Sequence, residues 1–130
     1  MLNYSSHVEA SGLDETRLAR KDLARILRVL SDPTRLSVFD MLMEGVQCNC
    51  ELAERLDLSL SLISHHLSAL RRVGLIEAEH DPDDARWIYY FVNRATLQRL
   101  ERDMAQLLDP HRIQPRMPSC GPKRCDGAGC

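Results

Sequence analysis

The sequence predicts a mainly α-helical domain that carries one small β-hairpin. Apolar residues recur at helical spacing along most of the chain between residues 13 and 109. Residues 86–92 are instead dense in aromatic and branched side chains, which is typical of a strand, and they follow a turn cluster at residues 81–85. These two observations predict four helices, then two strands, then a final helix.

The bulk composition agrees with one soluble domain. The chain has 130 residues, of which 44% are hydrophobic and 28% charged, and only 5% are aromatic, so aliphatic side chains must fill the core. No apolar run approaches the ~18–20 residues that a membrane span requires. The first residues show no secretory signal, and we expect a cytoplasmic protein without a membrane partner.

Three regions are expected along the chain. Residues 1–12 are polar and without periodicity, and we interpret them as a flexible N-terminal arm. Residues 13–109 form the folded domain. Residues 110–130 are rich in Pro, Gly and Cys and are interpreted as a flexible, Cys-rich C-terminal tail.

The first two predicted helices meet at a clear break. The first covers residues 13–30, and Ser31-Asp32-Pro33 ends it and starts the second, since Ser or Asp caps a helix and Pro suits its first turn. Gly45 is expected to end the second helix.

The next two helices lie within residues 46–76. The third is expected at Cys48–Asp57, and Ser59 is positioned to cap a fourth that Gly74 ends. Residues 75–80 and 86–92 then form the hairpin, and Asn93 caps a last helix that Pro110 ends. This order, α-α-α-α-β-β-α, is that of a winged helix-turn-helix.

In such a fold the fourth helix reads DNA, because its N-terminal residues lie against base edges in the major groove. Ser59 is interpreted as a cap and His66 as a structural residue. The net charge of −2 argues mildly against a protein that binds nucleic acid, although contacts in the groove depend on local charge. The predicted contacts on the fourth helix are Leu60, Ser61, Ser64 and His65, with the leucines of this turn also open to a core role.

Further cations flank this helix. Arg71 and Arg72 could reach phosphates or belong to a solvated face. The turn at residues 81–85 is acidic, and Arg86 beside it is predicted to contact the DNA backbone or minor groove. Pairing of Arg86 with Asp83 or Asp84 is the alternative.

The five cysteines lie in two clusters, one at Cys48 and Cys50 and one in the tail. In a reducing cytoplasm they are expected to be thiols. A helix start lowers the thiol pKa, and thiolates select soft ions. The predicted metal ligands are Cys48, Cys50, Cys120, Cys125 and Cys130.

With these residues in view, residues 23–108 resemble the ArsR/SmtB family of winged-helix metal-sensing repressors. Residues 30–36 resemble the start of the family's second helix, and residues 59–67 with 70–71 and 74–76 resemble its recognition helix. Residues 48–52 resemble the ELCVCDL metal box of its arsenic, cadmium and lead sensors. The resemblance implies a homodimer joined through the first and last helices, and an operator with two half-sites.

The resemblance is incomplete at the ligand set. Trivalent arsenic prefers three sulfurs, yet the N-terminal arm has no Cys, unlike that of cadmium and lead sensors. The tail can supply the third thiolate from either subunit, form a separate site, or have no ligand role. Asp103 has no His on its helix, so the family's interhelical zinc site is not expected.

The sequence thus favours a repressor that leaves its operator when arsenite or antimonite draws Cys48 and Cys50 together and shifts the recognition helix. A cadmium- or lead-responsive repressor and a thiol-oxidation-sensing regulator remain alternatives. A thiol-rich metal carrier or enzyme is disfavoured, because no catalytic triad, phosphate loop, carboxylate pair or organic cofactor motif is present.

Overall fold

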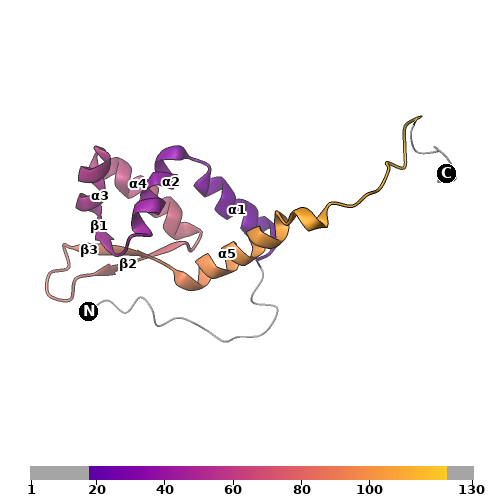
Figure 1. The fold of residues 1–130 in the computed structure, drawn as a ribbon. Coiled ribbons are helices and arrows are strands. Elements are labelled where there is room, and N and C mark those ends of the chain that lie inside the picture. Colours follow the sequence, from indigo (N-terminus) through magenta and orange to yellow (C-terminus); the bar gives the residue numbers. More distant parts are fainter. Residues whose placement is uncertain (1–17, 123–130) are drawn as a thin grey trace.

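The structure, a computed structural model, describes residues 18–122 (Figure 1). The expected order of elements is confirmed, with one additional short strand. The elements are α1 (Arg20–Leu30), α2 (Pro33–Leu42), β1 (Gln47–Cys48), α3 (Asn49–Leu56), α4 (Leu60–Arg72), β2 (Ile76–His80), β3 (Ile88–Val92), α5 (Arg94–Leu107) and the 3-10 turn η2 (Pro110–Arg112).

Three predicted helix caps are present. Asp32 accepts a hydrogen bond from the backbone N–H of Arg35 at 2.9 Å, with Pro33 in the first turn of α2. Ser59 and Asn93 each accept a backbone N–H from the third residue after them, at 3.1 and 3.0 Å. Each cap satisfies a donor that the helix itself leaves unpaired, and this explains why α2, α4 and α5 begin where the sequence predicted.

Other boundaries differ from the prediction. The first helix begins at Arg20, and residues 13–17 lie outside the described residues. The third helix begins at Asn49 instead of Cys48, because Cys48 belongs to a strand and serves as the N-cap. Part of the expected tail forms the turn η2, held by Asp109, which accepts the backbone N–H of His111.

The wing, defined here as residues 76–92, is part of a three-stranded antiparallel sheet in the order β1-β3-β2. The expected hairpin pairs Ile76 with Val92 through His80 with Ile88. The third strand was not predicted: β1 pairs with the other edge of β3, placing Gln47 opposite Tyr90 and Cys48 opposite Tyr89. The helix-turn-helix is therefore joined to the wing by a backbone ladder.

Helix α4 lies at the centre of the core. It packs against α2, α3 and β2, and α1 and α5 lie together at the end of the molecule away from the wing tip (Figure 1). Burying each large aliphatic side chain contributes about 1.5–3 kcal/mol. The fully buried side chains are Val38, Leu42, Leu52, Ile63, Leu67, Leu70 and Leu75.

The turn between α3 and α4 depends on a left-handed residue. Asp57 has φ 55°, a conformation that Asp tolerates better than most residues. It lets the backbone N–H of Leu58 return to the carbonyl of Ala53 at 3.0 Å. Among the described helices, none is both long and apolar enough to cross a membrane.

Candidate thiol pair and nucleic-acid interface

The first turns of α4 expose the side chains that the sequence predicted as DNA contacts. Ser61, Ser64 and His65 are exposed, and Leu60 is 52% exposed, so Leu60 is not part of the core. The opposite face of the helix is buried through Ile63, Leu67 and Leu70. The exposure of these four residues fits their predicted role as DNA contacts.

His66 lies on the buried side of α4, as expected of a structural residue. The Nε of Arg35 donates to its Nδ1 at 3.3 Å, and the same guanidinium donates to the carbonyl of Val29 at 3.0 Å. Burial lowers the pKa of His66, so the neutral ring that accepts this bond is favoured. Arg35 was not singled out from the sequence; it anchors α4 to the end of α1.

The wing cation is paired within the wing. Arg86 donates to the carboxylate of Asp84 from Nε at 3.0 Å and from its terminal nitrogen at 2.8 Å. This hydrogen bonding lowers the pKa of Asp84 and raises that of Arg86. The predicted alternative, pairing with an acid of the turn, is thus present, although the Arg86 side chain stays 87% exposed.

Arg71 and Arg72 lie at the other end of α4. Both are exposed, and neither forms an ion pair with any residue from 18 to 122. Both charges are therefore available to phosphates, and the contact of Arg71 with DNA stays a prediction.

The thiol pair, Cys48 and Cys50, is brought together by the start of α3. Their Sγ atoms are 2.8 Å apart, with Cys48 buried and Cys50 partly exposed. The carboxylate of Glu51 accepts the backbone N–H of Cys48 at 2.9 Å and closes this first turn. A capping residue three positions after the cap is a recognisable sequence signal, and Glu51 could have been found from it.

The electrostatics of the pair differ from the expectation. Burial raises the pKa of the Cys48 thiol from 9.0 to about 11, and its hydrogen bond with the Cys50 thiol adds to the increase. The helix start was expected to lower it; desolvation disfavours the thiolate more than the helix end favours it. Any ion that binds here must therefore displace protons.

Of the three tail cysteines, the structure describes Cys120 alone, and Cys120 does not join the thiol pair. Cys120 is exposed, and Cys125 and Cys130 lie outside the described residues. Residues 113–122 leave the end of α5 and run away from α3 (Figure 1). Within residues 18–122, no three His, Cys, Asp or Glu side chains gather as a metal site would require.

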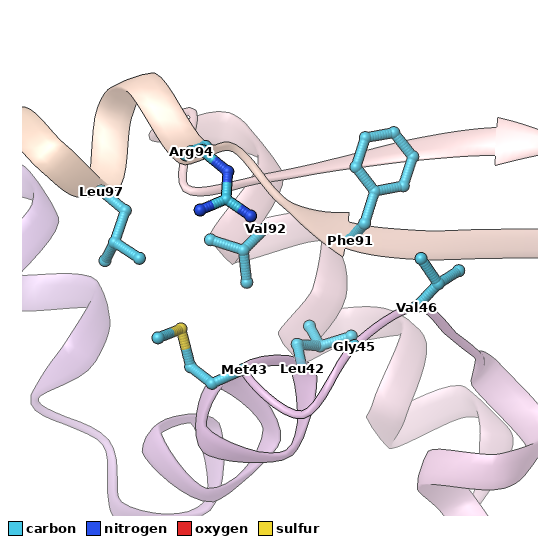
Figure 2. A pocket seen from close by; sticks show the side chains of 8 residues that line it. All are labelled: Leu42, Met43, Gly45, Val46, Phe91, Val92, Arg94 and Leu97. Carbon is cyan, nitrogen blue, oxygen red and sulfur yellow. The ribbon is translucent and has the colours of Figure 1, made fainter. Parts of the chain in front are cut away.

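A separate hollow of about 210 Å³ lies between α2, β3 and α5. Figure 2 shows Met43, Val92 and Leu97 pointing into it, with Arg94 at one side. Its lining is apolar apart from the cationic Arg94 and contains no thiol or carboxylate side chain. It does not suit a metal ion, and the thiol pair remains the candidate ion site.

A family profile described as bacterial regulatory protein, arsR family, matches residues 32–78, which run from the cap of α2 into β2. The chain is 32% identical over 87 residues to an arsenical resistance operon repressor from Staphylococcus aureus, covering 67% of this chain and 81% of that protein. The chain belongs to the ArsR family.

Other ArsR relatives support the fold and the functional class. The cadmium resistance transcriptional regulatory protein CadC from Listeria innocua is 28% identical over 98 residues, covering 72% of this chain and 80% of that protein. The structure of an ArsR-like transcriptional regulator from Rhodococcus sp. RHA1 superposes with a TM-score of 0.59 at 32% identity, covering 67% of this chain and 79% of that one. This ArsR-family chain is a winged helix-turn-helix transcriptional regulator and not an enzyme.

Proposed function

We propose that this ArsR-family protein is a cytoplasmic homodimeric repressor that binds a two-fold operator and releases it when trivalent arsenic or antimony binds its cysteines. One observation carries the proposal: two thiols lie 2.8 Å apart at the start of α3, the helix that leads directly into α4. Sulfur ligands suit soft ions. The relative from Staphylococcus aureus, an arsenical resistance operon repressor, favours arsenic.

The thiol pair supplies two ligands, and a third is proposed to come from the tail. Residues 113–122 are exposed and contain no α-helix or strand, and an extended chain spans up to ~3.3–3.6 Å per residue, which is the reach proposed for a tail thiol. Cys120, Cys125 and Cys130 are the candidates, from either subunit.

No zinc site is proposed at Asp103, the residue that lies where the family's interhelical zinc site would be. Its side chain is buried within the α1–α5 contact, where the backbone N–H of Leu18 donates to its carboxylate at 2.7 Å.

The close approach of the two thiols changes the switch that the sequence predicted. The two sulfurs are already adjacent, so nothing needs to draw them together. Two sulfurs bound to one soft ion, at roughly the 2.3 Å of a zinc–sulfur bond, would stand further apart than the 2.8 Å of the free pair. Spreading the thiols displaces β1 and the first turn of α3. Coupling of about 1–3 kcal/mol between the ion and the operator would suffice for induction.

Operator binding is assigned to the exposed side of α4. Ser61, Ser64 and His65 are proposed to contact base edges, with Leu60 against a thymine methyl group. Arg71 and Arg86 are proposed to contact phosphates. Two copies of α4 related by a two-fold axis would read half-sites about one helical turn apart.

The decisive experiment titrates the operator complex with arsenite, antimonite, cadmium and lead separately. Wild-type protein is expected to release the operator at lower concentrations of arsenite or antimonite than of cadmium or lead. Cys48→Ser with Cys50→Ser is expected to keep the operator bound at saturating arsenite, and release by this variant contradicts the proposal. A chain truncated after Pro118 tests the tail: retained release would remove the three tail cysteines from the ligand set.

Two alternatives have their own support. The cadmium resistance relative favours cadmium as inducer. Lead rests on the preference of thiolates for soft ions alone, and the ion titration separates the two. The contact between the two free thiols also favours a disulfide switch. In that case, peroxide with a chelator present would cause the protein to release the operator without any metal ion.

A further inference from the structure

A continuous set of contacts leads from the thiol pair to the tip of the wing. In the sheet, Cys48 of β1 lies opposite Tyr89 of β3. Directly opposed residues of antiparallel strands have Cβ atoms about 4.5–5.5 Å apart, and their side chains share one face. The thiol of Cys48 is close enough to contribute to the raised pKa of the Tyr89 hydroxyl, whose largest cause is its hydrogen bond to Asp81.

Tyr89 is tied to the turn of the wing. Its hydroxyl donates to one carboxylate oxygen of Asp81 at 2.9 Å. The other oxygen of Asp81 accepts the backbone N–H groups of Asp83 and Asp84 at 2.8 and 3.0 Å, and so holds the turn in shape. Asp84 in turn binds Arg86. One tyrosine hydroxyl thus connects the strand beside the thiols to the wing's only candidate phosphate contact.

We infer that Tyr89 is a positioning residue that transmits movement of Cys48 to the wing, so that inducer binding disengages the wing as well as α4. The inference rests on the proposed function. Cys48 pairs with Tyr89 in the short β1–β3 ladder, so we expect a displacement of Cys48 to be passed to Tyr89. When Tyr89 moves, the carboxylate of Asp81 loses this donor or follows it, and a carboxylate that follows moves the turn that orients Arg86.

The wing contains its own reporter. Trp87 is the only tryptophan in the sequence, is 47% exposed, and exchanges backbone hydrogen bonds with Asp81 and Asp84 at 2.9 and 3.0 Å. Its fluorescence therefore reports the turn without any DNA present. Arsenite is expected to change this emission in the wild-type protein and to leave it unchanged in Cys48→Ser with Cys50→Ser.

The test is Tyr89→Phe, which removes the hydroxyl and keeps the ring. Tyr90→Phe is the matched control, since Tyr90 lies next on β3 and its hydroxyl makes no hydrogen bond with residues 18–122. Three quantities are measured with arsenite as the probe: arsenite bound per chain, the Trp87 emission change, and the ratio of operator Kd values with and without arsenite. Losing one hydrogen bond is a modest change, so the Kd ratio is expected to fall roughly 2–12-fold in Tyr89→Phe.

The outcomes are distinct. Unchanged arsenite binding with a smaller emission change and a smaller Kd ratio, seen in Tyr89→Phe and not in Tyr90→Phe, supports the inference. If wild-type protein releases the operator and Tyr89→Phe gives the same ratio and the same emission change, the inference is wrong and the proposed function stands. If wild-type protein neither binds arsenite nor releases the operator, both are wrong. Asp81→Asn, which weakens the acceptor of the same bond, should reproduce the Tyr89→Phe result.

Discussion

Helix α4 and the wing are the two parts of this molecule suited to approach DNA, and they treat their polar groups in opposite ways. The first turns of α4 expose Ser61, Ser64 and His65, whose side chains form no hydrogen bond with residues 18–122. The wing tip binds its own groups instead: Arg86 pairs with Asp84, and Asp81 accepts from Tyr89 and two backbone N–H groups. A side chain without an internal hydrogen bond can bind DNA directly, whereas a paired side chain must first give up its internal hydrogen bond.

This difference predicts which part of the molecule provides most of the operator affinity and which part can be switched. Helix α4 is held by buried leucines, so its exposed face is presented in one orientation. The wing tip carries Asp81, Asp83 and Asp84 against one arginine, and a negative tip repels phosphates. We therefore expect α4 to supply most of the operator affinity and the wing to supply a small contribution that internal contacts can switch.

The largest effect expected concerns the anchoring of α4. Leu67→Ala should lower the free energy of unfolding by about 2–5 kcal/mol, because Leu67 is fully buried and the substitution leaves a cavity. Leu60→Ala, on the exposed side of the same helix, should change it by less than about 0.5 kcal/mol. Urea denaturation monitored by circular dichroism compares them. Similar losses in both variants would mean that the two faces of α4 are assigned wrongly.

An intermediate effect is expected from the exposed face of α4. Ser64→Ala and His65→Ala should each weaken operator binding by about 1–3 kcal/mol, since each removes a group placed to meet a base edge. Fluorescence anisotropy with a labelled operator measures the loss, and Arg86→Ala is the wing comparison. A greater loss from Arg86→Ala than from either substitution in α4 would reverse the division of labour between helix and wing.

The smallest effect concerns the wing pair. Asp84→Asn should free Arg86 and remove one negative charge, and an exposed ion pair of this kind is weak because water screens it. Operator affinity should therefore rise by roughly 1.4–5-fold, with a steeper dependence on salt as one more cation meets a phosphate. The part of the gain that comes from freeing Arg86 should be lost in the double variant with Arg86→Ala, which should keep only the gain from removing the negative charge. A loss of affinity on Asp84→Asn would show that the pair positions Arg86 instead of restraining it.

Local signals predicted much of this structure. Asp32, Ser59 and Asn93 cap helices as expected, because caps depend on residues only a few positions apart. Strand β1 was missed because two residues carry no periodicity and the partner strand lies far along the chain. The same cause hid Tyr89, whose importance comes from lying opposite Cys48. The raised thiol pKa was missed because burial depends on the whole core.

The pairing of β1 with β3 has a consequence for how such proteins can be recombined. The Cys-x-Cys segment is not an independent cassette, since its backbone completes a sheet whose central strand comes from the wing. A chimera that exchanges residues 46–50 alone would join the two cysteines to an unmatched strand. If the thiol pair binds the inducer as proposed, we expect specificity to be transplanted between relatives only when residues 46–50 move together with β3, as one unit assembled from two distant parts of the chain.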